Sequence, residues 1–135
     1  MNYISTFIAV AEDCKVGHGK VPAGRGPGRT VAQIQYEMLS THPFTYTQED
    51  VLFESWFARQ GLDVDDAEKA ELRAAFFSKD QPCLRTSPLA RTHGWGLICD
   101  AEGRIALCAI DSPDYRGHLE AGDLKVIKAM RTKRG

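Results

Sequence analysis

The chain has 135 residues, which is the usual size of one domain and too short for two ordinary ones. Its hydrophobic fraction of 43% and charged fraction of 26% are typical of a globular protein and exclude a disordered or fibrous chain. The formal net charge of −1 provides no overall attraction to nucleic acid or to anionic lipid.

The start of the chain carries neither a long apolar segment nor the pattern of a secretory signal. The apolar run over residues 7–11 is far shorter than a membrane span, and no basic region precedes it. We therefore expect a cytoplasmic protein that does not engage membranes. In that reducing compartment the four cysteines are expected to be free thiols.

The first third of the chain contains a strand pattern and then a long loop pattern. Residues 3–11 are rich in β-branched and aromatic side chains, and neither face of their alternation is polar, which predicts a central strand covered on both sides. Residues 12–30 are rich in glycine and proline and show no helical or strand period, which predicts a loop.

Helix-capping signals follow the loop. Thr30 is the expected N-cap of a first helix that ends before Pro43, and Thr47 is the expected N-cap of a second helix that ends near Gly61. A third helix is predicted from about Asp65 to Lys79, because acids crowd its first turn and a lysine occupies its last.

The clearest strand signal lies in residues 94–111, where two apolar runs flank a turn that ends in Gly103 and so predict an antiparallel hairpin. Apolar spacing over residues 118–132 predicts a C-terminal helix with a basic end. We expect an α+β fold in which a small, mostly antiparallel sheet of three or four strands packs against about three helices. Residues 1–118 would form the single domain, and residues 119–135 a basic C-terminal extension that could be helical.

Several strings in the sequence, taken together, resemble a family of short bacterial proteins that is defined as a domain of unknown function. They include QPCLRTSPL at 81–89, GWG at 94–96 and DAEGRIAL at 100–107. The resemblance extends to about residue 116 and places the basic tail outside the family pattern. It implies no activity, cofactor or catalytic residue.

A first candidate site is built on a cysteine. A thiolate needs a nearby positive charge, and a catalytic thiol usually needs an imidazole to accept its proton. Cys83 with Arg85, His93 and an orienting Asp111 could supply these parts as a catalytic set. The alternative is structural: Cys83 begins a strand and Arg85 pairs with a surface acid.

A second candidate site is the glycine-rich loop, which runs directly into a helix N-terminus. Free backbone N–H groups, the helix dipole and two arginines favour an anion there. The expected anion-binding residues are Arg25, Gly26, Gly28, Arg29 and Thr30. The spacing is not that of a P-loop, because Arg25 and Gly26 replace its lysine and hydroxyl residue. A surface loop without a ligand is the alternative.

A third candidate is a polar and aromatic pocket for a small polar ligand, formed by His42, Tyr46, Asp50 and Trp95. Local roles in capping and packing are the alternative for each of these residues singly. The histidines are scattered without metal-ligand spacing, so we expect neither a metal site nor a cofactor.

No motif in the chain demands chemistry, so the favoured function is a binding or interaction domain with a polar or anion-binding cleft. Its partner would be a small polar ligand or a protein. A small enzyme that depends on Cys83 is the second hypothesis. A nucleic-acid accessory protein is the third, although nucleic acid is not the expected partner. An apolar sheet edge would be compatible with a homodimer.

Overall fold

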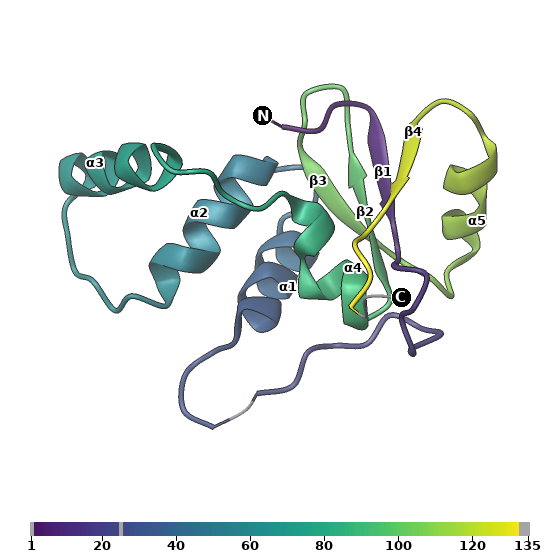
Figure 1. Cartoon of the computed structure of the whole chain (residues 1–135), viewed down its shortest axis with the longest axis horizontal. Helices are drawn as coiled ribbons and strands as arrows, with labels where there is room; N and C mark the ends of the chain where they lie inside the picture. The colour runs from purple at the N-terminus through teal and green to yellow at the C-terminus, as the bar shows by residue number, and fades with distance from the viewer. Residues whose placement is uncertain (1, 25, 133–135) are drawn as a thin grey trace.

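The computed structural model describes residues 2–24 and 26–132, and they form one four-stranded sheet with helices on both faces (Figure 1). The strands are β1 (Thr6–Ala9), β2 (Trp95–Cys99), β3 (Ile105–Ala109) and β4 (Lys125–Lys128). Their order is β3-β2-β1-β4. β1 pairs antiparallel with β2, as β2 does with β3, whereas β4 runs parallel to β1. The α+β class is confirmed, and the sheet is mixed.

Five α-helices and one 3-10 turn are present in the described part of the chain, rather than about three helices. They are α1 (Val31–Thr41), α2 (Gln48–Ala58), α3 (Asp66–Phe77), the 3-10 turn η1 (Leu84–Thr86), α4 (Pro88–Thr92) and α5 (Pro113–Glu120). The three helices with capping signals in the sequence are confirmed as α1, α2 and α3.

The caps explain where these helices begin. The Thr30 hydroxyl accepts a hydrogen bond from the backbone of Gln33, and the Gln33 side chain accepts one from the backbone of Thr30, which completes a capping box. Thr47 and Asp50 form the same arrangement at the start of α2. The Asp65 side chain caps α3.

The predicted hairpin is confirmed by β2 and β3. Trp95 pairs with Ala109 at one end of the ladder and Cys99 pairs with Ile105 at the other. Gly103 adopts a φ of +79° in the connecting turn, a backbone conformation that a side chain would strain. The turn chemistry therefore sets the register of the hairpin.

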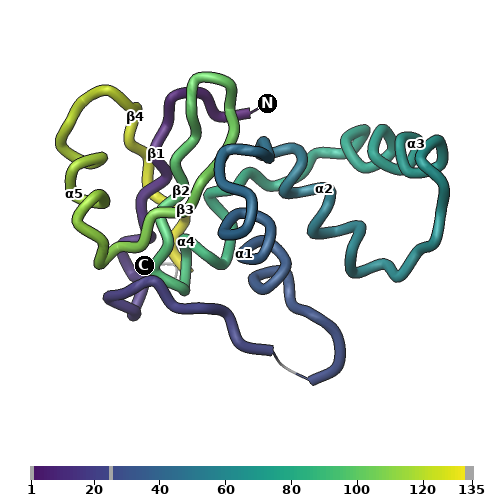
Figure 2. Tube along the Cα trace, turned by 180° about the vertical axis from the view of Figure 1, so that it is seen from behind, coloured from purple at the N-terminus to yellow at the C-terminus, as the bar shows by residue number. Residues whose placement is uncertain are grey.

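The core is divided by the sheet into two layers. Ile8 and Leu97 lie in a cluster with residues of α1 and α4, while Phe7 and Ala9 pack with Tyr115 of α5 on the other face. Figure 2 shows α5 on one side of the sheet and α1 and α4 on the other. The prediction that the first strand is central and covered on both sides is confirmed.

The C-terminal segment is the main correction to the predicted elements. A helix was expected over residues 118–132, but helical structure ends with α5 and the chain then forms β4. The backbone of Lys125 donates to Ser5 and that of Ala129 to Ala9, so β4 closes the open edge of β1. The segment that was expected to be a C-terminal extension thus contributes a strand to the sheet.

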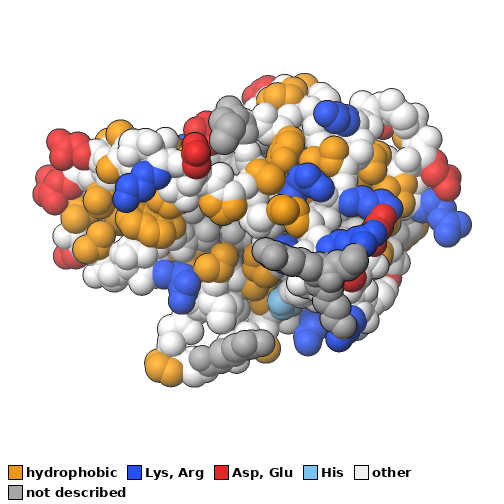
Figure 3. Space-filling model, in the orientation of Figure 1, with side chains coloured by type: hydrophobic (Ala, Val, Ile, Leu, Met, Phe, Trp, Pro, Cys, Tyr) orange, Lys and Arg blue, Asp and Glu red, His pale blue; other side chains and the backbone are white. Residues whose placement is uncertain are grey.

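Helices α2 and α3 form an arm that projects away from the sheet, at the left of Figure 1. None of the residues of α3 is fully buried. Phe76 is half-buried and contacts Phe53 and Trp56 of α2. Hydrophobic side chains gather over this arm on the left of Figure 3. We refer to residues 48–77 as the α2–α3 arm.

Candidate functional site

A cleft of about 510 Å³ lies between the glycine-rich loop, the first turn of α1 and the end of α4. We call it the His93 cleft. Its lining is formed by Lys20, Ala23, Gly24, Thr30, Val31, Ala32, Pro88, Thr92 and His93. Three segments of the chain, at residues 20–24, 30–32 and 88–93, therefore meet in one cavity.

The loop wall of the His93 cleft is held in place by hydrogen bonds to the sheet side. The backbone of Lys20 donates to the His93 carbonyl at 2.8 Å, and the Trp95 indole donates to the Lys20 carbonyl at 2.9 Å. Gly94 permits this approach, because its φ is +76° and an added Cβ would lie 2.1 Å from the His18 carbonyl oxygen. The glycine is thus required for the loop to reach the end of α4.

The first turn of α1 supplies backbone donors to the cleft. Thr30 and Gln33 satisfy each other in the capping box. The N–H groups of Val31 and Ala32, which lie between Thr30 and Gln33, have no acceptor within the helix and none among the described residues. Both residues line the cleft, at the positive end of the helix dipole.

The charged and polar side chains of the cleft also suit an anion. Lys20 is basic, and no acidic side chain occurs among the lining residues that the structure describes. His93 Nδ1 lies 3.0 Å from the Pro88 carbonyl oxygen and 2.8 Å from Thr92 Oγ1. A carbonyl oxygen only accepts, which assigns the proton of the neutral ring to Nδ1. Nε2 is then an acceptor, and it donates to an anion only when the ring carries a second proton.

The structure does not bring Cys83 and His93 together. Cys83 is the N-cap of η1 and His93 the C-cap of α4, so both of these short elements lie between the two residues. Cys83 lines a different cavity, of about 310 Å³, near the start of α2. Asp111 accepts a hydrogen bond from the backbone of Gly19. His93 and Asp111 both help to hold the loop, away from the thiol.

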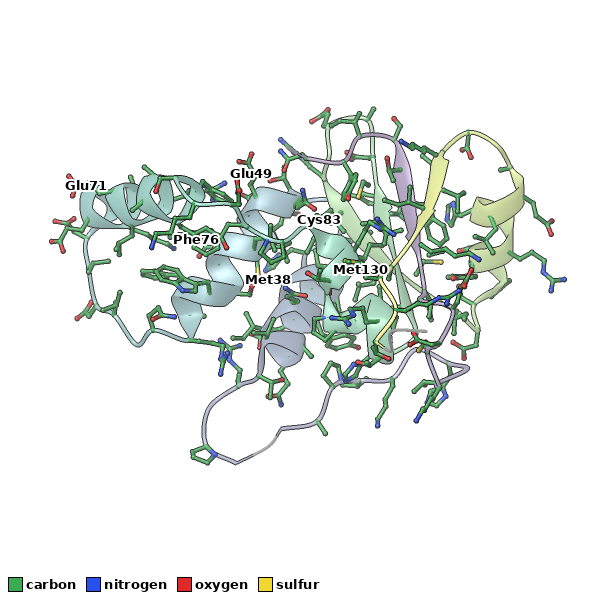
Figure 4. All side chains as sticks on the ribbon, in the orientation of Figure 1. Met38, Glu49, Glu71, Phe76, Cys83 and Met130 are labelled. Carbon is green, nitrogen blue, oxygen red and sulfur yellow. The ribbon has the colours of Figure 1, made fainter. Side chains whose placement is uncertain are left out.

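Cys83 and Arg85 do lie near each other, beside Tyr3. Burial, followed by a hydrogen bond to Cys83, raises the pKa of Tyr3 to about 12, while the charge of Arg85 acts in the opposite direction. The Arg85 guanidinium also donates to the Lys128 carbonyl at 2.7 Å. Figure 4 shows Cys83 close to Glu49, which lines the same cavity.

Cys99 and Cys108 are buried in the sheet. Burial, together with the nearby Asp100 carboxylate, raises the pKa of Cys99 to about 12. Burial also raises the pKa of Cys108. Both side chains therefore remain protonated thiols near neutral pH, and neither is a candidate nucleophile.

The predicted anion-binding residues of the glycine-rich loop are dispersed. Arg25 lies outside the described residues. Gly26 and Gly28 adopt positive φ angles of 86° and 83°. Arg29 forms an ion pair with Glu37 of α1, which offsets its charge. From this set, Thr30 alone is among the described lining residues of the His93 cleft.

The polar and aromatic group is divided between two ends of the sheet. Tyr46 lies beside Ile105, whose backbone donates to its carbonyl, and the His42 ring contacts the Tyr46 ring at 5.9 Å. Ile105 pairs with Cys99 at one end of β2, and Trp95 lies at the other end of the strand. The rise per residue of a strand separates Trp95 from Cys99 by roughly 13 Å. Asp50 caps α2 and forms an ion pair with Arg73 at 3.0 Å.

Lys20 and Thr92 are among the lining residues of the His93 cleft that were not predicted from the sequence. A signal for the second existed, because Ser87 followed by Pro88 is the N-cap and first position of a helix, as α4 shows. That helix places Thr92 and His93 at its end. A single lysine in a loop carries no such signal.

The described residues offer neither a metal site nor a membrane-spanning helix. No group of three or more His, Cys, Asp or Glu side chains is arranged to hold a metal ion within residues 2–24 and 26–132. Over the same residues, none of the helices has the length and apolar character needed to cross a membrane.

Comparison with known proteins identifies a family. No curated protein and no solved structure matches the chain. A family model described as a family of unknown function, DUF6157, matches residues 1–135. The match includes the C-terminal segment, so the expectation that the basic tail lies outside the family pattern is wrong. Because the match spans the whole chain, the protein belongs to this family of unknown function, DUF6157.

Proposed function

We propose that this protein is a binding domain that holds a small anionic ligand in the His93 cleft. The observation that carries the proposal is the convergence of unpaired backbone donors, at Val31 and Ala32, with Lys20 and His93 in a cavity whose described lining contains no carboxylate. Helix N-termini bind anions through such N–H groups and through the positive end of the dipole.

The shape of the cleft supports a ligand larger than a free inorganic anion. Its volume of about 510 Å³ falls within the range of small-molecule sites. Ala23 and Pro88 supply apolar surface beside the polar groups. The anionic group would lie at the first turn of α1, with the Lys20 ammonium at its flank, and His93 Nε2 would accept a hydrogen bond from a hydroxyl or amine elsewhere on the ligand.

A sulfate titration at constant ionic strength, followed by the amide resonances of the whole chain, tests this proposal. The amides of Val31 and Ala32 should shift and saturate together. Lys20→Ala should weaken the affinity about fivefold, because one charge-assisted contact is removed. Lys15→Ala is the matched control, since Lys15 is an exposed lysine of the same loop outside the cleft lining.

Two results would reject the anion-binding proposal. One is a set of small shifts spread over the surface without saturation at the first turn of α1. The other is an equal loss of affinity in Lys20→Ala and Lys15→Ala, because general charge screening would then explain the binding.

A second candidate function is a small cysteine-dependent enzyme that uses Cys83. It is favoured by the contact of Cys83 with Tyr3, by the proximity of Arg85 and by the cavity of about 310 Å³ in front of the thiol. Alkylation by iodoacetamide at pH 7 should then be faster at Cys83 than at Cys14, and Arg85→Met should slow it. Equal rates at the two cysteines would remove this candidate.

Support for a nucleic-acid partner is weaker. Lys128 and Arg131 of the basic tail both form ion pairs with Glu12, and these two cations lower the pKa of Glu12. Part of the positive charge of the tail is therefore offset within the protein. A gel-shift experiment at increasing salt concentration would detect any contact of the tail with nucleic acid.

A further inference from the structure

A second cleft lies beneath the α2–α3 arm, on the side that faces α1 and η1. Its volume is about 210 Å³, and it is lined mainly by apolar side chains. We call it the Gln35 pocket. The residues that matter here are Gln35, Leu52, Ser55, Trp56, Phe76 and Ser87.

Two aromatic rings form one wall of the Gln35 pocket. Trp56 of α2 and Phe76 of α3 have ring centroids 5.2 Å apart, and both are half-buried. Figure 4 shows Phe76 pointing from α3 toward α2. α3 has no fully buried residue, so a local movement of α3 away from α2 would break few buried contacts.

The floor of the pocket is a buried polar chain. Gln35, with 3% of its surface exposed, accepts a hydrogen bond from the Ser87 hydroxyl at 2.6 Å. Its amide nitrogen donates to the Ser55 hydroxyl at 3.5 Å, the outer limit for such a bond. A side-chain amide nitrogen carries two hydrogens. The second therefore has no acceptor within the described part of the chain.

We propose that the Gln35 pocket binds a small molecule with one aromatic ring that carries a carbonyl group. The ring would contact Trp56 and Phe76, and the carbonyl oxygen would accept the free N–H of Gln35. A carbonyl fits because its oxygen only accepts, as the unpaired donor requires. A dry cavity of about 150 Å³ already holds benzene, so the pocket has room for a substituted ring.

This site is distinct from the His93 cleft in chemistry and in its test. Val31 and Pro88 line both cavities, so the two are neighbours. The Gln35 pocket contains no charged side chain in its described lining, whereas the His93 cleft contains Lys20. The proposal therefore does not depend on anion binding.

The experiment uses the full chain labelled with 5-fluorotryptophan. The chain has two tryptophans, Trp56 in the pocket wall and Trp95 in β2, so Trp95 is an internal control and Trp95→Phe assigns the two fluorine signals. Acetophenone is the test ligand. Ethylbenzene is its matched comparison, because it has nearly the same shape but no acceptor.

Acetophenone should shift the Trp56 signal with saturation and leave the Trp95 signal in place. Ethylbenzene should bind roughly fivefold more weakly, which is the usual size of one neutral hydrogen bond. Gln35→Met, which keeps the side-chain length and removes the amide, should abolish the difference between the two ligands. If that variant does not fold, the comparison of the two ligands on the unaltered chain remains decisive.

Three results would overturn the proposal. The first is an absence of any saturable shift at Trp56. The second is a parallel shift of both tryptophan signals, which would indicate non-specific partitioning. The third is equal affinity for acetophenone and ethylbenzene, which would show that Gln35 offers no hydrogen bond to a ligand.

Discussion

Gly94 shows how one residue controls the geometry of the proposed site. Its positive φ and its contact with the His18 carbonyl leave no space for a Cβ, so Gly94→Ala should lower the free energy of unfolding by about 2 kcal/mol or more. The affinity of the His93 cleft for sulfate should fall as well, because the loop wall would move. Urea denaturation measures the first effect and the amide titration the second.

Gly117→Ala is the matched control for this substitution. Gly117 lies inside α5 with nothing within 4 Å of an added Cβ, so the change should stabilise the protein by about 0.5–1 kcal/mol. Equal unfolding midpoints for the two alanine variants would contradict the role assigned to Gly94.

The raised pKa of Cys99 should make the free energy of unfolding depend on pH in the alkaline range. Its pKa is raised to about 12 in the folded protein, well above that of a thiol in the unfolded chain. The folded state therefore holds the proton longer, and this contribution to stability is complete below about pH 8.5 and lost as the pH rises toward 12. Tyr3 acts in the same direction, between about pH 10 and 12.

The free energy of unfolding should accordingly decline between about pH 9 and 12, and Cys99→Ala should make the decline shallower by at most about 4 kcal/mol. Denaturant titrations at several pH values measure this. Between pH 6 and 8 the thiol is protonated in both states, so there the variant should differ from the unaltered chain by a constant amount. An unchanged alkaline slope in Cys99→Ala would contradict the assignment.

At the scale of elements, β4 is the feature whose contribution is easiest to test. A chain that ends at Gly122 lacks β4, its backbone hydrogen bonds to β1 and the buried Ala129. We expect its free energy of unfolding to fall by about 3 kcal/mol or more. A chain that ends at Met130 keeps the strand and loses exposed contacts of Arg131 and Thr132, so it should change by less than about 1 kcal/mol.

The same truncation decides the domain boundary expected from the sequence. If residues 1–118 fold as a complete domain, the chain that ends at Gly122 will unfold with the midpoint of the full chain. Circular dichroism during urea denaturation would show this, and such a result would contradict a stabilising role for β4.

The α2–α3 arm should differ from the rest of the molecule in its dynamics. Hydrogen exchange of the α3 amides is expected to be faster than that of α1, β1, β2 and β3, because these elements contain buried residues and α3 contains none. Phe76→Ala should accelerate it about tenfold and leave β2 unchanged, since the Phe76 ring contacts Phe53 and Trp56.

Glu71→Ala is the control for the α3 prediction. Glu71 is exposed and points away from α2 in Figure 4, so its removal should not alter exchange in the arm. Equal acceleration by both variants would show that α3 opens for reasons other than its aromatic contact.

At the scale of the whole molecule, sequence reasoning succeeded where the signal was local. Thr30 and Thr47 cap helices because their side chains bond backbone groups three residues away. Gly103 closes the hairpin because the turn itself requires a positive φ. These features depend on a few neighbouring residues, so the amino-acid pattern is enough to predict them.

The pattern was insufficient where distant segments compete or converge. The apolar residues around 125–128 have a spacing compatible with a helix. These residues instead pair as β4 with the open edge of β1, which lies more than a hundred residues earlier in the chain. Cys83 and His93 are only ten residues apart in the sequence, and they were expected to belong to one catalytic set. Because η1 and α4 lie between them, the two residues line different cavities.

The sequence by itself thus determined the class of the fold, its three capped helices, its hairpin and the central strand, because each rests on short-range hydrogen bonding or on the alternation of apolar residues. Only the tertiary structure decided which side chains share a cavity. Lys20, Val31 and His93 meet because Gly94 and the Lys20 backbone hold the loop against α4, a contact that no local pattern encodes.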